Sequence, residues 1–379
     1  MSLPIYLDYN ATTPVAQEVL EAMLPYLREH FGNPSSSHPY GRRAQEAVAR
    51  AREQVAGLIG ADPGGIVFTG CATEANNLAI LGVAEALGGR GRHLITSAVE
   101  HPAVARPMEH LRGRGWDLTV LPVDGYGRVS PDDLALALRA DTVLVSVMHA
   151  NNEVGTLQPI AELAALARAR GVLFHTDAAQ STGKIPVDVD SLGVDLLTIA
   201  GHKLYGPKGV GALYVRAGTP IAPIQSGAGH ERGLRPGTEN VTHIVGLGAA
   251  AELAWARLPE GMDRLRERRD ALHQRLTAAV PGLVLNGHPV ERLPNTLNLS
   301  FPGASGRALL ARAAAIAASV GSACHEEGAG VSGVLGAMGV SAERAQGAVR
   351  LSIGEPTTDA EIRQAADALI AAWRALVPQ

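Results

Sequence analysis

The chain has 379 residues, of which 46% are hydrophobic, and its formal net charge at neutral pH is −4. This length favours two domains, and the apolar content is ample for a globular enzyme, which argues against a disordered chain. A charge this close to zero gives no global attraction to nucleic acid or to anionic lipid. We therefore expect a small-molecule or protein partner and no direct nucleic-acid partner.

The N-terminal segment, the apolar stretches and the cysteines indicate the compartment in which the protein is expected. Residues 1–8 contain no basic segment followed by a long apolar run, and no later apolar stretch reaches membrane length without a charge. Cys71 and Cys324 are the only cysteines, and their sequence contexts differ sharply, so a structural disulfide is not expected. These features favour a reducing compartment, and we expect a cytoplasmic protein that has no contact with a membrane.

Short β-branched runs alternate with amphipathic stretches between residues 65 and 215. The alternation predicts a large α/β domain with a seven-stranded, mainly parallel sheet. The predicted strands are 66–68, 93–96, 118–121, 142–147, 172–175, 195–199 and 211–215. A helix is predicted at 160–170, with Gly171 after it as a left-handed cap.

The pattern changes after residue 241 to long helical stretches, including 262–280. Strands are predicted near 296–301 and 348–353, and a final helix is predicted from Thr358 onward. Together they indicate a smaller α+β domain. We place the large domain at residues 15–257 and the small domain at 1–14 and 258–379, because the opening segment is expected to pack against the second unit.

Lys203 is the first candidate for a catalytic group, because it is one of only three lysines and follows a predicted strand. A lysine amine in its neutral form adds to an aldehyde cofactor in Schiff-base chemistry, and a carboxylate can hold a pyridine nitrogen protonated. Asp177 also follows a predicted strand and could be that carboxylate, although a lone aspartate there is more often a structural cap. The alternative of a nucleotide-binding glycine loop at 202–211 is disfavoured, since the P-loop ending and the dinucleotide glycine spacing are both missing.

Residues 69–77 follow the first predicted strand and enter a helix whose unpaired amides would bind a phosphate. Thr73 would add a hydroxyl donor. Taken alone, the segment is better explained as an ordinary threonine cap with Glu74 in the first turn, because such caps are common.

Five segments together resemble the pyridoxal-phosphate-dependent cysteine desulfurases of the NifS/IscS type, which have the aspartate-aminotransferase-like fold (type I). The segments are 7–14 (LDYNATTP), 31–36 (FGNPSS), 72–77 (ATEANN), 148–155 (MHANNEVG) and 237–240 (GTEN). The resemblance runs nearly end to end. It implies conversion of L-cysteine to L-alanine with pyridoxal 5'-phosphate, and transfer of the sulfur to an enzyme cysteine as a persulfide, for iron–sulfur cluster assembly, tRNA thiolation or both.

The resemblance also implies a role for each matching position. Lys203 would carry the cofactor covalently, and Asp177 would pair with the ring nitrogen. Gln180 would bond to the ring hydroxyl, and His101 would stack on the ring and shuttle protons. On its own, His101 would be taken for a histidine at a helix start.

Further positions match residues that hold the cofactor or the substrate. The implied cofactor contacts are those of Ala72, Thr73, Asn152, His202 and Thr238, with Thr73 and His202 on the phosphate. Thr238 matches a position that reaches the phosphate of the neighbouring subunit, which implies a homodimer with shared sites. Asn152 and Arg350 match positions that hold the substrate, and the planar guanidinium of Arg350 suits its carboxylate.

Cys324 matches the sulfur-accepting cysteine of the family and would lie in the small domain. The glycine-rich run that follows it predicts a mobile loop, whose length resembles the subgroup that hands sulfur to an iron–sulfur scaffold or another acceptor protein. The plain alternative is a small buried core residue. No resident metal is expected, and Cys324 would at most be a transient iron–sulfur ligand together with a scaffold protein. Cys71 is expected to pack beneath the cofactor.

Three features of the sequence depart from the family pattern. Ala200 stands where a phosphate-binding serine is usual, so one cofactor anchor is missing. Glu326 and Glu327 follow Cys324 where small hydroxyl residues are common, and their charge would raise the pKa of the thiol. Ala228 replaces a usual glycine and matters less. The alternatives to a cysteine desulfurase are a selenocysteine lyase or aminotransferase of the same fold, and a catalytically silent homologue that only recruits partners.

Overall fold

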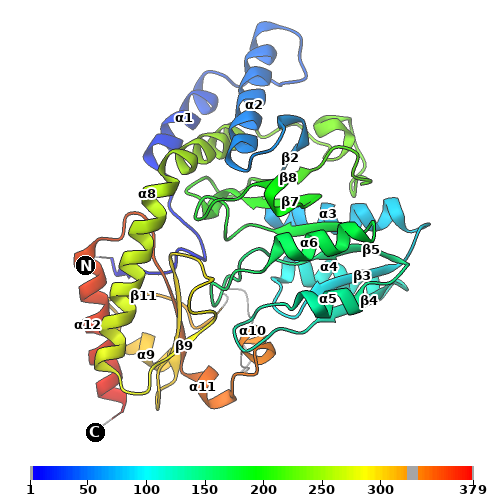
Figure 1. Cartoon of the computed structure of the whole chain (residues 1–379). Helices are drawn as coiled ribbons and strands as arrows, with labels where there is room; N and C mark the ends of the chain where they lie inside the picture. Colours follow the sequence, from blue (N-terminus) through cyan, green and yellow to red (C-terminus); the bar gives the residue numbers. More distant parts are fainter. Residues whose placement is uncertain (1–2, 322–331, 378–379) are drawn as a thin grey trace.

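Seven strands form the largest sheet of the computed structural model, which describes residues 3–321 and 332–377. The strands lie in the order β2-β8-β7-β6-β5-β3-β4 (Figure 1). Their bounds are β2 Ile66–Thr69, β3 His93–Ser97, β4 Asp117–Leu121, β5 Thr142–Ser146, β6 Leu173–Asp177, β7 Leu196–Ala200 and β8 Gly211–Val215. Only β8 runs antiparallel to its neighbours, β2 and β7. The predicted seven-stranded, mainly parallel sheet is therefore confirmed.

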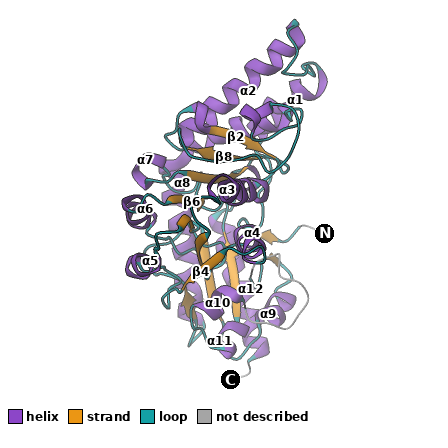
Figure 2. Ribbon diagram, turned by 90° about the vertical axis from the view of Figure 1, so that its right-hand side faces the viewer, coloured by secondary structure: helices purple, strands orange, loops and turns teal. Residues whose placement is uncertain are grey.

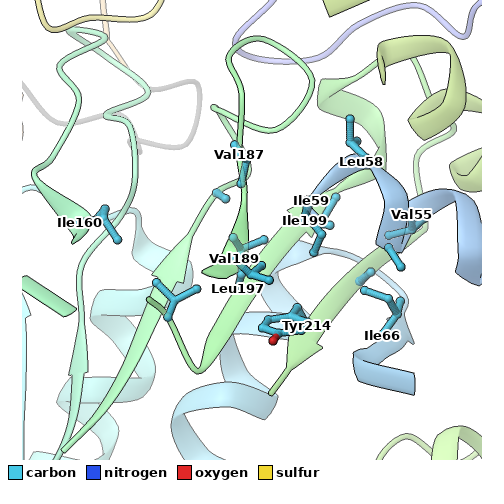
Figure 3. Packing of buried hydrophobic residues seen from close by; sticks show 14 of the residues in the cluster. Val55, Leu58, Ile59, Ile66, Ile160, Val187, Val189, Leu197, Ile199 and Tyr214 are labelled. Atoms are coloured by element: carbon cyan, nitrogen blue, oxygen red, sulfur yellow. The ribbon is translucent and has the colours of Figure 1, made fainter. Parts of the chain in front are cut away.

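Helices cover both faces of this sheet, because successive residues of a strand point to opposite sides. Leu197 and Ile199 of β7 pack with α2 (Pro39–Leu58) and the first half of α8, as Figure 3 shows in part. Leu196 faces α3 (Ala72–Leu87) and α4 (Pro102–Arg112) on the other side. Figure 2 shows α5 (Pro131–Ala137) and α6 (Ile160–Ala169) across the sheet from α3 and α4.

The connections follow the expected backbone chemistry. Helix α6 stops just before Gly171, whose φ of 63° is the left-handed conformation predicted for its cap. Short helix α7 (Val189–Leu192) joins β6 and β7 and also ends on a left-handed glycine, Gly193. None of the helices in the described part of the chain combines the length and apolar composition needed to cross a bilayer.

A second core surrounds a three-stranded antiparallel sheet. Its strands are β9 (Val284–Asn286), β10 (Thr296–Ser300) and β12 (Ala348–Ser352), in the order β12-β10-β9. The core is completed by α12 (Asp359–Leu376), α9 (Gly306–Arg312) and the last part of α8. Two short helices, α10 (Gly333–Ala337) and α11 (Ala342–Gln346), lie at its edge (Figure 1).

Helix α8 (Val241–Ala279) joins the helical stretches predicted after residue 241 into one element of 39 residues. It continues through Pro259, which removes one backbone donor. Its N-terminal part packs on α1 (Gln17–Arg28) and α2, and its C-terminal part packs on α12. The predicted division between residues 257 and 258 falls inside this helix, so α8 contributes to both cores and the domain limits stay a prediction.

The opening segment crosses from the second core to the large sheet. Strand β1 (Ile5–Tyr6) pairs in parallel with β11 (Ile316–Ala317), and Leu7 is buried in the second core. A few residues later the chain reaches the end of β7, where the backbone N–H of Thr13 donates to the carbonyl of His202 at 3.0 Å. This short segment therefore forms one wall of the cleft between the two sheets.

Candidate active site

One cavity lies at the carboxyl ends of β6 and β7, where the opening segment meets them. Its volume, counting the open mouth, is about 920 Å³. It is lined by the predicted site residues Ala72, Thr73, His101, Asn152, Asp177, Gln180, His202, Lys203 and Arg350. Asn10, Asn76 and Ala200 also line it. Residues from distant parts of the sequence thus converge on one cavity, as expected for strand ends in such a sheet.

Lys203 ends a short 3₁₀ turn, Gly201–Lys203, that follows β7 directly. Its Nζ donates to the backbone carbonyls of Asn10 at 2.5 Å and of Ala11 at 2.8 Å. The half-buried amine is therefore held at the cavity wall by the opening segment.

Asp177 is the last residue of β6, and its carboxylate is buried. One oxygen accepts a hydrogen bond from Asn76 Nδ2 at 2.7 Å, and the other accepts one from the backbone N–H of Ala179 at 2.9 Å. The amide oxygen of Asn76 is buried without a hydrogen-bond partner among the described residues. These two N–H donors fix the position of the carboxylate at this wall of the cavity.

The N-terminus of α3 forms the opposite end of the cavity. Cys71 caps this helix, since its Sγ accepts from the N–H of Glu74 at 3.4 Å, so Thr73 is not the cap. A side chain at Gly211 of β8 would collide with the backbone of Cys71 and Ala72 at 2.7 and 2.9 Å. The absence of a side chain at Gly211 thus allows the first turn of α3 to lie directly over the sheet edge. The exposed side chain of Thr73 belongs to this turn.

His202 lies between this helix end and Lys203. Its Nδ1 is 3.1 Å from Thr12 Oγ1. Burial lowers the pKa of His202 to about 4, and the positive charges of Lys203 and Lys208 act in the same direction. The ring is therefore neutral at physiological pH and keeps one N–H donor.

Ala200, at the end of β7, is buried in the cavity wall and brings no hydroxyl group there. Cys71 also lines the cavity, and its side chain is exposed. Its predicted packing under a cofactor stays a prediction.

His101 is the N-cap of α4, and its Nδ1 accepts from the N–H of Ala103 at 3.1 Å. The plain interpretation of His101 as a helix-start histidine is thus correct, and the ring lines the cavity as well. Because Nδ1 is an acceptor, the neutral ring carries its proton on Nε2. Glu100, next to it, is buried, and burial raises the pKa of its carboxyl to about 8, with Ser97 and the N–H of Met148 as partners.

Arg350 lies in the middle of β12 and is only 1% exposed. Its Nη2 is 2.6 Å from Asp8 Oδ1, and its Nη1 donates to the carbonyl of Asn152 at 3.1 Å. Its Nε is buried without a hydrogen-bond partner in the described part of the chain. The guanidinium is thus already engaged on two nitrogens, and residual N–H groups remain for an anion.

Two predicted site residues lie elsewhere. Thr238 is exposed in the loop before α8 and does not line this cavity. Cys324 lies outside the described residues, as do the neighbouring Glu326 and Glu327. Within residues 3–321 and 332–377, the structure has no group of three or more His, Cys, Asp or Glu side chains that could hold a metal ion.

Two residues of the site had no role in the sequence prediction. Asn10 accepts from Lys203 through its carbonyl and donates from Nδ2 to Thr296 Oγ1 at 2.9 Å, so it links both sheets. Lys184 is buried beside Gln180 and donates to its Oε1 at 2.9 Å. Asn10 falls in one of the five segments that carry the family resemblance, whereas no local pattern distinguishes Lys184.

The chain is similar to known proteins over nearly its full length. The class-V aminotransferase family matches residues 5–364. The chain is 48% identical over 371 residues to a cysteine desulfurase IscS of Dictyoglomus turgidum, and the match covers 97% of this chain and 94% of the relative. It is 45% identical over 362 residues to a cysteine desulfurase of Homo sapiens, with 95% of this chain and 79% of the relative covered.

Solved structures show the same similarity. A NifS-like protein superposes with a TM-score of 0.92 at 39% identity, over 97% of this chain and 99% of that chain. SspA in complex with cysteine superposes with a TM-score of 0.83 at 37% identity, over 92% of this chain and 98% of that chain. The chain therefore belongs to the class-V aminotransferase family, among its pyridoxal-phosphate-dependent cysteine desulfurases.

Proposed function

We propose that the cavity between Lys203, Asp177 and the start of α3 converts L-cysteine to L-alanine, and that the sulfur passes to Cys324 as a persulfide. The observation that carries the proposal is the convergence of these three features on one cavity, although they are far apart in sequence. The amine, the buried carboxylate and the helix N-terminus are the three anchors that pyridoxal phosphate requires.

The described residues fit this cofactor. Asp177 would pair with the ring nitrogen, and Gln180 would bond to the ring oxygen. Thr73, the first amides of α3 and the neutral His202 would hold the phosphate as hydrogen-bond donors. When bound, pyridoxal phosphate supplies an aldehyde that condenses with an amine and a ring that accepts the electron pair released at Cα.

Lys203 and His101 would move the protons. Lys203 Nζ would remove the Cα proton of the substrate as a general base. His101 would stack on the ring and carry a proton on Nε2, because its Nδ1 is occupied by the start of α4. The substrate carboxylate would bind the remaining N–H groups of Arg350 and the side chain of Asn152. Among the similar structures, that of SspA is a complex with cysteine, which supports the same substrate for this cavity.

The sulfur step needs one further nucleophile. The Cys324 thiolate would attack the substrate sulfur, so that a sulfur–sulfur bond forms as the carbon–sulfur bond breaks. The electron pair of the broken bond stays on the carbon, which takes up a proton and leaves as part of L-alanine. The products balance as one persulfide and one L-alanine for each L-cysteine.

The partners of the enzyme are part of the same proposal. The exposed Thr238 would reach the phosphate of a second subunit, so the active form would be a homodimer. The persulfide would serve an iron–sulfur scaffold or another sulfur-acceptor protein in the cytoplasm, for cluster assembly or tRNA thiolation.

The test is an assay of L-alanine and sulfide formed from L-cysteine in the presence of pyridoxal phosphate and a thiol. We expect equal amounts of both products. Alanine from selenocysteine alone would show a selenocysteine lyase, and amine transfer that depends on a keto acid would show an aminotransferase. A purified protein that gains no visible absorbance band with pyridoxal phosphate would be a silent homologue.

Ala200→Ser tests the anchor that this chain lacks. A hydroxyl at this position would add one hydrogen bond to the phosphate, so we expect the variant to bind pyridoxal phosphate about tenfold more tightly. Ala228→Gly, the other change toward the family residue, lies exposed outside the cavity and is expected to leave the Kd unchanged. Both values come from titration of the unloaded proteins, and equal Kd values for Ala200→Ser and the wild type would contradict the assignment.

A further inference from the structure

Lys184 is a buried lysine that the proposed reaction does not use. Only 7% of it is exposed. Its Nζ donates to Gln180 Oε1 at 2.9 Å and lies 3.5 Å from Asn10 Oδ1. Within residues 3–321 and 332–377, no carboxylate forms an ion pair or a hydrogen bond with this amine. A long side chain is thus buried to contact two amides, which calls for a functional explanation.

The contact fixes the orientation of the Gln180 amide. Lys184 donates to the amide oxygen, and the Asn10 carbonyl on the other side can only accept, so the two partners together turn the oxygen toward Lys184 and the nitrogen toward Asn10. The nitrogen donates to the carbonyl of Asn10 at 3.0 Å, and the same carbonyl accepts from Lys203. A flipped amide would turn its oxygen toward the Asn10 carbonyl oxygen, so this buried carbonyl would lose its hydrogen bond from Gln180.

The second hydrogen on Gln180 Nε2 is the one that the Asn10 carbonyl does not use. Gln180 lines the cavity, so this N–H is available to an oxygen of the bound molecule. Lys184 and the Asn10 carbonyl together therefore present Gln180 to the cavity as a donor.

The surroundings of Lys184 favour an uncharged amine. Burial lowers the pKa of Lys184 well below its ordinary value, and the positive charges of Lys203 and Arg350 lower it further. The other titratable side chains beside it are Tyr9, Tyr205 and Glu355, which share a second, smaller cavity with Lys184. A neutral amine still donates to Gln180 but places no additional charge beside Lys203.

We propose that Lys184 is a positioning residue that fixes the Gln180 amide with its N–H toward the ring oxygen of the cofactor. This inference rests on the proposed function, because the ring oxygen belongs to the proposed cofactor. An N–H donor stabilises that oxygen as an anion, and this lowers the pH at which the covalent linkage to Lys203 loses its proton. The consequence can be measured in the absorbance of the bound cofactor, separately from turnover.

The first experiment is a pH titration of the visible absorbance band in the loaded wild type and in Lys184→Met. Methionine has nearly the same length but no donor, so the amide oxygen of Gln180 loses its partner and the amide is held by the Asn10 carbonyl alone. We expect the midpoint to rise by about one pH unit, the size expected when a hydrogen bond to an anion is lost. An unchanged midpoint in Lys184→Met would overturn the inference.

A double-mutant cycle separates positioning from a direct effect of Lys184. Gln180→Leu alone is expected to raise the midpoint by a similar amount, and adding Lys184→Met should then cause no further change. A further rise in the double variant would show that Lys184 acts without Gln180. Should Lys184→Met not fold, Lys184→Gln replaces it, because its amide keeps an N–H donor. The midpoint of Lys184→Gln is expected to lie closer to that of the wild type than the midpoint of Gln180→Leu does. The reverse order would overturn the inference.

The unloaded protein gives an independent check of the uncharged state. Because the pKa of Lys184 is lower in the folded than in the unfolded chain, the unfolded chain binds more protons between those two values. The free energy of unfolding of the wild type should therefore rise with pH, relative to Lys184→Met, as the pH approaches the ordinary lysine pKa of about 10.4 from below. Urea unfolding at several pH values measures this difference, and parallel curves would show that Lys184 stays charged.

The two proposals fail in different ways. A wild type that gains no visible band and forms no alanine contradicts the proposed function. A wild type that forms alanine, with the same midpoint in Lys184→Met, contradicts only the role of Lys184.

Discussion

Lys203→Ala is expected to lower L-alanine formation from L-cysteine by at least about three orders of magnitude, since the variant lacks both the covalent anchor and the general base. The amine cannot be replaced by a neighbour, because the only other lysine of the cavity region, Lys184, is held by Gln180 and Asn10. The measurements are alanine release under saturating cysteine and the visible spectrum after addition of pyridoxal phosphate. We expect the variant to lose both signals while its far-ultraviolet circular dichroism stays that of the wild type.

Lys208→Ala is the matched control for this experiment. Lys208 is exposed and lies five residues further along the chain, so its loss should leave the spectrum and the rate within about twofold. Borohydride reduction of the loaded wild type gives a second, independent result. The chain has only three lysines, and the pyridoxyl group should be found on the peptide that contains Lys203. A label on Lys184 or Lys208 would contradict the assignment.

The large sheet could be predicted because its signal is local. The strands are short, mostly apolar runs, several of them rich in β-branched residues, and the seven predicted strands differ from the observed ones by no more than two residues at either end. Helix α8 was harder to delimit. Its first half packs on α1 and α2 and its second half on α12, and these tertiary contacts carry one helix through Pro259.

The site was predicted in part for a similar reason. Asp177 and Lys203 follow strands, and the ends of adjacent parallel strands share one edge, so their approach follows from the fold class. The contacts that orient the side chains of the site cannot be predicted from the fold class. The Asp8 partner of Arg350 is 342 residues away in sequence, and Lys184 reaches Asn10 across 174 residues. Both contacts depend on how the opening segment crosses between the two cores.

Cys324→Ala is expected to keep the cofactor band and to lose the sulfur transfer. Apart from Thr238, the residues proposed to hold the cofactor line the cavity described above, and Cys324 is not one of them, so the visible spectrum should match that of the wild type. Sulfide release from L-cysteine in the presence of a thiol should fall by about two orders of magnitude or more, because no thiolate remains to take the sulfur. Normal sulfide release in this variant would rule out a persulfide on Cys324.

Cys71, the other cysteine of the chain, is the alternative acceptor, so a labelling experiment can show which of the two thiols takes the sulfur. Cys71 lines the cavity and is exposed, so it is the only other thiol that could accept the atom. Cys71→Ser keeps a side chain that caps α3, and serine is among the preferred capping residues. After reaction with sulfur-labelled cysteine, label released by a reductant should be found on Cys324 in this variant and be absent from Cys324→Ala. Label on Cys71 in Cys324→Ala would mean that sulfur is taken up at the start of α3, inside the cavity, and that no loop movement is needed to deliver it.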